Sequence, residues 1–188
     1  MNLPNILTLS RIIMIPVLLL VFYLPWEHRH IASAALFAIV AATDWLDGYL
    51  ARLWNQTTPF GAFLDPVADK LMVAVALIAL VEEHHSMWLT VPAIVIVGRE
   101  IVISALREWM AEMGKRASVA VSYIGKIKTV CQMFSIIVLL ATVPKSDLSY
   151  VGLVLLDVSA MLTLWSMFIY LKAAWPDLMP PKNSREWG

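Results

Sequence analysis

The chain has 188 residues, of which 60% are hydrophobic, and it carries 14 basic and 14 acidic side chains, so its formal net charge is zero. A soluble domain is typically about 45–50% apolar, and a neutral chain offers no electrostatic reason to bind nucleic acid. The single cysteine, Cys131, excludes a disulfide within the chain. Composition therefore favours a membrane protein with no nucleic-acid partner.

Six apolar segments follow one another along the chain, each long enough to cross a hydrocarbon core about 30 Å thick as a helix. They cover residues 6–24, 31–52, 65–82, 87–108, 124–143 and 148–171. Strands are implausible, because the segments show no sustained alternation and lipid requires internally satisfied backbone hydrogen bonds. We therefore predict an all-α integral membrane protein with six transmembrane helices, forming a single domain over residues 1–188.

The residues around these segments predict how the chain lies in the membrane. Asn5, Thr8 and Arg11 are spaced by three, which suggests a short helix at the membrane surface whose polar edge either anchors there or contacts a headgroup. If both termini are cytoplasmic, the outer connections carry only Arg29 and Lys145, and the inner connections and helix ends carry eleven basic residues. This asymmetry agrees with the positive-inside rule.

Four histidines fall in the connections on the predicted outer side. They are His28, His30, His84 and His85. Short polar loops usually leave such side chains in water, so we expect solvated residues here and no metal site.

Four aspartates lie close together in this otherwise apolar chain. Asp44 and Asp47 close the second segment, and Asp65 and Asp69 open the third. Spacings of three and four place each pair on one face of a helix. The third helix starts either at Asp65 or early enough for Gly61 to extend the same face. A short loop on the inner side can then bring all four carboxylates together.

Four bare carboxylates at a membrane edge would repel one another, and a bound cation removes that conflict. Oxygen ligands without a nearby thiol or imidazole favour Mg²⁺ or Mn²⁺, and four carboxylates can hold two ions, an arrangement that suits displacement at phosphorus. Isolated helix caps are the structural alternative. A divalent-cation transporter is a remote alternative, because transporters usually bind ions near the midplane between repeats, and no repeat is visible here.

The spacing of these residues resembles a known family. The motif reads Asp44-x2-Asp47-Gly48-x2-Ala51-Arg52-x8-Gly61-x3-Asp65-x3-Asp69, and it is similar, without departure, to the signature of the CDP-alcohol phosphatidyltransferases. Three further stretches resemble the bacterial branch of that family that uses sn-glycerol 3-phosphate. They are Asn5-x2-Thr8-x2-Arg11, Gly98-Arg99-Glu100 with Arg107, and Gly125-Lys126-Ile127-Lys128-Thr129.

The resemblance implies a homodimer in the bacterial cytoplasmic (inner) membrane, among membrane lipids, with its active site facing the cytoplasm. It implies transfer of the phosphatidyl group from CDP-diacylglycerol to sn-glycerol 3-phosphate, with release of CMP. Asp44, Asp47 and Asp65 would bind metal, and Asp69 would bind metal and act as general base. The expected CDP-diacylglycerol contacts are Thr8, Gly48, Ala51, Arg52 and Gly61.

Basic residues further along the chain are the candidates for the acceptor phosphate. They are Arg99, Arg107, Lys126 and Lys128. Arg99 and Arg107 are eight residues apart, about 80° around a helix, and can face one cavity. An arginine within an apolar run is costly and usually functional, although a structural ion pair with Glu100 is the alternative. A neutral acceptor would not need this basic group, whereas inositol phosphate would, so a family member that uses inositol phosphate is the nearest alternative.

Overall fold

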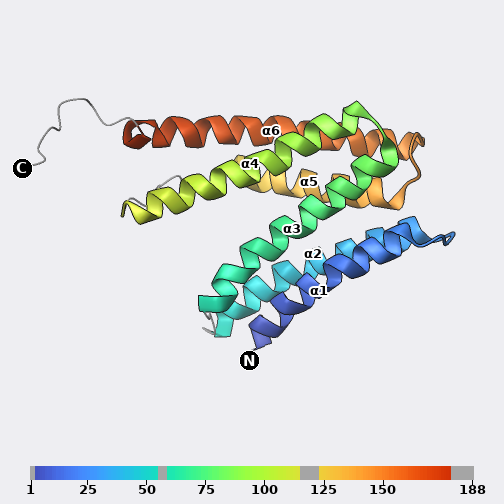
Figure 1. The fold of residues 1–188 in the computed structure, drawn as a ribbon, viewed down its shortest axis with the longest axis horizontal. Helices are drawn as coiled ribbons and strands as arrows, with labels where there is room; N and C mark the ends of the chain where they lie inside the picture. The colour runs from blue at the N-terminus through green and yellow to red at the C-terminus, as the bar shows by residue number, and fades with distance from the viewer. Residues whose placement is uncertain (1–2, 55–58, 115–122, 179–188) are drawn as a thin grey trace, which may run out of the picture.

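The computed structural model describes the backbone of residues 3–54, 59–114 and 123–178, and the side chains of residues 9–43, 61, 64–114, 125, 127–175 and 178. Regular structure within these ranges is entirely helical. The helices are α1 (Leu3–Tyr23), α2 (Arg29–Trp54), α3 (Pro59–His84), α4 (Met87–Glu112), α5 (Tyr123–Ala141) and α6 (Asp147–Leu178). Each predicted apolar segment corresponds to one of them, which confirms the all-α prediction (Figure 1).

Most helices run beyond the apolar segments, because helix propensity does not stop where hydrophobicity does. The early start of α3 at Pro59 is the correct alternative, so Gly61 belongs to the same helix as Asp65 and Asp69. The predicted surface helix at the N-terminus is not a separate element. Its residues form the first turns of α1, which continues without a break from Leu3 to Tyr23.

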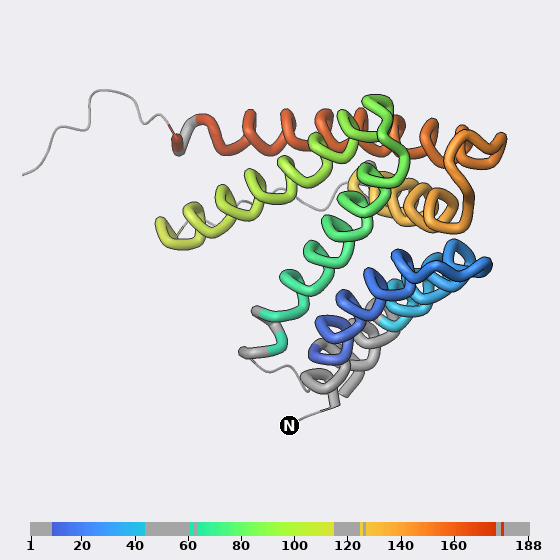
Figure 2. The backbone as a smooth tube through the Cα atoms, turned by 45° about the vertical axis from the view of Figure 1, so that its right-hand side comes forward, coloured from blue at the N-terminus to red at the C-terminus, as the bar shows by residue number. Residues whose placement is uncertain are grey.

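The helices run alternately in opposite directions. The connections 24–28, 85–86 and 142–146 lie at one end of the molecule, and the start of α1 and the end of α6 lie toward the other (Figure 1). In the tube view, α1 lies along α2, and α5 lies along α6, with α3 crossing between the two groups (Figure 2). α5 also contacts α2, and α4 contacts both α3 and α6. The four aspartates lie toward the end opposite the three connections.

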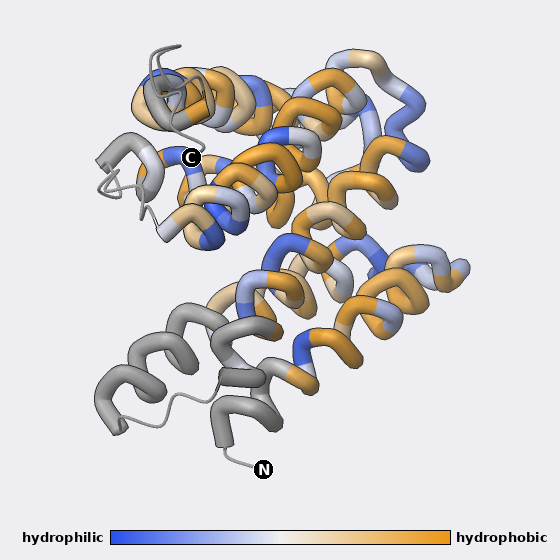
Figure 3. The backbone as a smooth tube through the Cα atoms, turned by 60° about the vertical axis from the view of Figure 1, so that its left-hand side comes forward, coloured by the Kyte–Doolittle hydropathy of each residue, from blue (hydrophilic) through white to orange (hydrophobic). Residues whose placement is uncertain are grey.

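Hydrophobic side chains fill the interior and also cover the outside. Leu18, Phe37, Leu77, Ile96 and Leu156 are among the buried core residues, whereas Ile39, Ile78, Ile94, Met161 and Phe168 are more than 60% exposed. Hydrophobic residues extend over most of the helix lengths (Figure 3). By length and composition, two helices in the described part of the chain can cross a membrane, Met87–Glu112 and Asp147–Trp175. An apolar outer surface is what a lipid environment favours.

Small and hydroxyl-bearing residues bring α5 and α6 close together. Ser135 and Ser149 are fully buried, and the Ser135 hydroxyl donates to the carbonyl oxygen of Gly152 at 2.7 Å. A Cβ on Gly152 would lie 2.8 Å from the Leu139 side chain. Small residues allow this close approach between helices in lipid, where dispersion contacts replace the hydrophobic effect.

The expectation of solvated outer histidines is wrong for two of the four. His84 is 9% exposed, and the His30 side chain is 12% exposed with Nε2 3.6 Å from Glu83 Oε1. Arg29 Nη2 contacts the same oxygen at 2.5 Å. The reason is that both histidines belong to helices and not to loops: α2 begins at Arg29 and α3 continues to His84. Burial lowers the pKa of His84, which lies past the apolar segment of α3.

Candidate active site

The helix backbone places both acidic pairs toward one end of the molecule. Asp44 and Asp47 belong to the second half of α2, and Asp65 and Asp69 to the first half of α3. Several predicted site residues lie outside the described side chains: Thr8, Asp44, Asp47, Gly48, Ala51, Arg52 and Lys126. Their roles therefore stay predictions. Gly61, which is described, is buried within α3.

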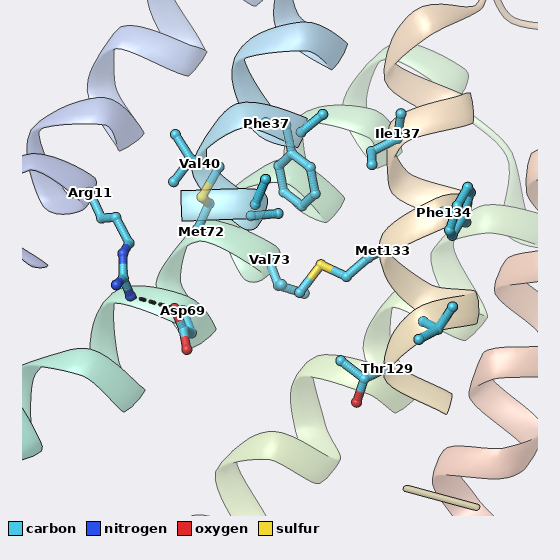
Figure 4. Close-up of a pocket in the computed structure, with 14 residues that line it drawn as sticks. Arg11, Phe37, Val40, Asp69, Met72, Val73, Thr129, Met133, Phe134 and Ile137 are labelled. Carbon is cyan, nitrogen blue, oxygen red and sulfur yellow. Dashed lines mark hydrogen bonds and ion pairs between the residues drawn. The ribbon is translucent and has the colours of Figure 1, made fainter. Parts of the chain in front are cut away.

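Asp65 and Asp69 are partly buried and lie one helical turn apart, so they share a face of α3. Asp69 Oδ1 accepts a hydrogen bond from Arg11 Nη1 at 3.2 Å, and the Arg11 side chain is 5% exposed (Figure 4). The sequence places Arg11 on a polar edge at the membrane surface or a headgroup. The tertiary structure instead turns it onto the fourth aspartate of the motif.

The donor set at this end fits a hard divalent cation. Asp65 and Asp69 offer carboxylate oxygens, and Gly61 adds no side chain to the same helix. Oxygen ligands of this kind suit Mg²⁺ or Mn²⁺. Among the side chains that the structure describes, no three histidine, cysteine, aspartate or glutamate residues form a metal-binding group. The predicted cluster needs Asp44 and Asp47 as well, which lie outside that set.

A pocket of about 410 Å³ lies beside Asp69, between α1, α2, α3 and α5. Its polar members are Arg11, Asp69 and Thr129, and the rest of its lining is apolar. Arg11 and Asp69 lie on one side of it, and Met133 and Phe134 on the other (Figure 4). An apolar pocket that ends at an ion pair matches an amphiphilic ligand, with hydrocarbon inside and a charged group beside Asp69.

A second pocket, of about 250 Å³, lies between α4, α5 and α6. It is lined by Arg99, Glu100, Arg107, Gly125, Lys128, Thr129, Ser166 and Tyr170. The prediction that Arg99 and Arg107 face one cavity is confirmed, and Lys128 from α5 joins them. Three cations and one carboxylate leave this pocket with a net charge of about +2, which favours a phosphate.

The cations in this basic pocket have internal partners. Glu100 Oε1 accepts from Arg99 Nη1 at 2.7 Å and from Lys128 Nζ at 3.2 Å. The alternative ion pair between Arg99 and Glu100 is therefore present. The Arg99 Nε atom is buried and has no hydrogen-bond partner among the described residues.

α6 contributes two residues that the sequence analysis missed. Tyr170 Oη accepts from Arg107 Nη2 at 2.8 Å, and the Arg107 guanidinium carbon lies 5.2 Å from the centre of the Tyr170 ring. The Ser166 hydroxyl accepts from Arg99 Nη2 at 3.5 Å. Ser166 and Tyr170 are four residues apart on one helix face, and this spacing of polar groups in an apolar segment was the available signal.

The two pockets adjoin. Thr129 lines both of them, so the amphiphile pocket beside Asp69 borders the basic pocket. A second connection joins the helices: Lys70, which follows Asp69, donates to the Ser104 hydroxyl, and that hydroxyl donates to the Glu100 carbonyl oxygen at 2.5 Å. Thr129 and the Lys70–Ser104 contact therefore connect the acidic face of α3 with the basic pocket.

The structure thus pairs an apolar pocket that ends at Asp69 with a basic pocket, and comparison with known proteins gives the class of the protein. The profile of the CDP-alcohol phosphatidyltransferase family matches residues 1–170, and the chain belongs to that family of enzymes.

Individual relatives are similar over nearly the whole chain. A protein of Yersinia pestis (strain Pestoides F) is 56% identical over 181 residues, covering 96% of this chain and 99% of the relative. A protein of Shigella flexneri serotype 5b (strain 8401) is 57% identical over 178 residues, covering 95% of this chain and 97% of the relative. Both are named CDP-diacylglycerol–glycerol-3-phosphate 3-phosphatidyltransferase.

Proposed function

We propose that this protein transfers the phosphatidyl group from CDP-diacylglycerol to sn-glycerol 3-phosphate, forming phosphatidylglycerophosphate and CMP in glycerophospholipid biosynthesis. The observation that carries the proposal is the meeting of the two pockets at Thr129. One pocket suits a lipid with a charged headgroup, and the other suits a phosphate. The names of the similar Yersinia and Shigella proteins support the same pair of substrates.

In this proposal the donor lies with its apolar part in the pocket beside Asp69. Phe37, Met133 and Ile137 are among the side chains that would contact hydrocarbon there. The nucleotide end would lie along the motif of α2 and α3, where Gly48 and Gly61 leave room and Arg52 would contact phosphate. Thr8 and Ala51 complete the proposed donor site.

The acceptor places its phosphate in the basic pocket, held by Arg99, Arg107 and Lys128, and by Lys126, two residues before Lys128 in α5. This leaves its free hydroxyl to point past Thr129 toward Asp69. Asp69 accepts the hydroxyl proton while the acceptor oxygen attacks the phosphorus that carries the lipid. The new phosphorus–oxygen bond forms as the bond to CMP breaks, and CMP leaves with the electron pair.

Two ions, Mg²⁺ or Mn²⁺, would be held by Asp44, Asp47, Asp65 and Asp69, and when bound they stabilise the charge on the transferring phosphate groups. The chain's own contribution beside them is the Arg11–Asp69 pair. The Arg11 guanidinium donates to Asp69 Oδ1 and so fixes the direction of the carboxylate that would accept the proton.

We further propose that all six helices span the bacterial cytoplasmic (inner) membrane, with both termini and the active site on the cytoplasmic side. The apolar outer surface and the distribution of lysine and arginine support this placement. The homodimer follows from the family resemblance, and the mass of the purified protein in detergent would test it.

The experiment is a reaction of the purified full-length protein with CDP-diacylglycerol, Mg²⁺ or Mn²⁺, and sn-glycerol 3-phosphate. We expect CMP release together with phosphatidylglycerophosphate, and loss of both products when a chelator removes the metal. CMP release with inositol phosphate, but not with glycerol 3-phosphate, would overturn the acceptor. Metal-ion flux through vesicles without CMP release from any acceptor would favour the transporter alternative.

A further inference from the structure

A carboxylate, that of Glu100, is part of the lining of the basic pocket and pairs with two of its three cations. Glu100 Oε1 contacts both Arg99 at 2.7 Å and Lys128 at 3.2 Å. The side chains of Arg99 and Lys128 are 11% and 6% exposed, whereas that of Glu100 is 27% exposed. The carboxylate is therefore more accessible than the two cations that it pairs.

One oxygen of Glu100 serves two cations on two helices, and the backbone carbonyl of the same residue accepts from Ser104. Arg107, the third cation, has no ion pair among the described residues, and it is held by Tyr170 at the same pocket. The two inner cations are thus occupied by an internal anion, and the outer one is presented to solvent.

We propose that Glu100 is an internal competitor for the acceptor's phosphate. In the empty pocket its carboxylate holds Arg99 and Lys128 in place. A phosphate that enters past Arg107 takes over these two cations and moves the carboxylate aside. The chemical class that displaces Glu100 is a phosphate monoester dianion, because its two charges match the net charge of about +2 that three cations and one carboxylate leave.

The competition has a consequence for turnover. The proposed product still carries the acceptor's phosphate monoester, so the cations that bind the substrate also hold the product. Tight binding of the product slows its release, and product release can limit kcat. The return of Glu100 to Arg99 and Lys128 replaces the contacts of the departing phosphate, and it therefore limits how tightly the product is held.

Glu100→Gln tests this, because it keeps the shape of the side chain and removes its charge. Glu108→Gln is the matched control, since Glu108 is an exposed carboxylate on the same helix and does not line the pocket. We measure binding calorimetrically in detergent, without donor lipid, using methyl phosphate and dimethyl phosphate at pH 8. The former is a dianion and the latter a monoanion at this pH.

We expect Glu100→Gln to bind methyl phosphate about tenfold more tightly or more, as when a like charge within a few ångströms of an anion is removed. The gain for methyl phosphate should be about the square of the gain for dimethyl phosphate, because Coulomb energy scales with the ligand's charge. In turnover, the KM for glycerol 3-phosphate should fall, kcat should not rise, and the KM for CDP-diacylglycerol should stay unchanged. Glu108→Gln should match the wild type in every measurement.

Weaker or unchanged binding of methyl phosphate by Glu100→Gln would overturn the proposal, because Glu100 would then only organise the cations. Unchanged methyl phosphate binding with weaker glycerol 3-phosphate binding would also overturn it and would place Glu100 on the acceptor's hydroxyls. If Glu100→Gln does not fold, Glu100→Asp decides. The aspartate keeps the negative charge but holds it one methylene further from Arg99 and Lys128. A modest gain in methyl phosphate affinity would therefore support the competition, and a loss would refute it.

The statement that glycerol 3-phosphate is the ligand that displaces Glu100 rests on the proposed function. The binding experiment with methyl phosphate does not depend on it. Failure to turn over glycerol 3-phosphate would count against the function alone, and failure of Glu100→Gln to tighten methyl phosphate binding would count against the competitor alone.

Discussion

Replacing Arg107 by glutamine should lower kcat/KM for the acceptor, glycerol 3-phosphate, and leave that for the donor unchanged. Arg107 is exposed and contacts Tyr170 through a 2.8 Å hydrogen bond and through the ring face. Its removal leaves no buried charge without a partner, so stability should change by no more than about 0.5 kcal/mol. By contrast, removal of Arg99 would disturb the buried group around Glu100, which makes Arg107 the cleaner test of the acceptor site.

The size of the effect follows from the contact that is lost. A charge-assisted hydrogen bond to a phosphate is worth about 1.5–3 kcal/mol. This corresponds to a loss of about 10- to 150-fold in kcat/KM for glycerol 3-phosphate. Tyr170→Phe removes only the hydroxyl that orients Arg107, which is worth about 0.5–1.5 kcal/mol, and it should cost about 2- to 10-fold.

The assay measures initial rates of CMP release, with one substrate varied while the other is saturating. Lys172→Gln is the matched control, because Lys172 is an exposed cation on α6 that does not line the pocket. It tests whether loss of one positive charge alone explains the effect. Equal losses for donor and acceptor in Arg107→Gln would refute the reasoning, and so would an unchanged kcat/KM for glycerol 3-phosphate.

Three other outcomes are expected. Asp69→Asn should retain CDP-diacylglycerol binding and lose turnover by at least about 100-fold, as for a lost general base; substantial remaining turnover would exclude that role. Gly152→Ala should lower the free energy of unfolding by about 1–3 kcal/mol, because the new Cβ would lie 2.8 Å from Leu139. A thermal melt in detergent measures this loss. Gly98→Ala is the control: its Cβ meets open space, so it should leave the stability unchanged or raise it by up to about 1 kcal/mol. Burial lowers the pKa of His84 below its usual 6.5, so below about pH 6.5 the unfolded chain takes up a proton before the folded chain does. The free energy of unfolding should therefore fall as the pH drops below about 6.5, by at most about 1.4 kcal/mol per pH unit. His84→Gln should remove that slope, and a variant of exposed His28 should not.

The helices and the acidic motif could be predicted because both depend on short-range patterns. Apolar runs of sufficient length become helices in either a protein interior or a lipid, and spacings of three and four determine which residues share a helix face. This is why the six helices, and the common face of Asp65 and Asp69, follow from residues 6–171 alone. The same periodicity correctly placed Arg99 and Arg107 in one cavity.

Helix boundaries were less predictable at the polar ends. Pro66 is compatible with a helix that starts at Asp65, but α3 begins at Pro59, six residues earlier. The turn between α3 and α4 likewise follows His84, so a histidine expected in water is buried beside Glu83. Hydrophobicity marks the part of a helix that lipid can cover, and it does not mark where backbone hydrogen bonding ends.

The sequence by itself therefore determined the helical class, the acidic face and the family. Only the tertiary structure decided which faces meet: Arg11 reaches Asp69 across 58 positions, Lys128 reaches Glu100 across 28, and Tyr170 reaches Arg107 across 63. The physical reason is that helical periodicity gives only the direction in which a side chain points from the axis of its own helix. The neighbour that it meets depends on how separate helices pack, and that is decided by small residues such as Gly152 and by burial over the whole molecule.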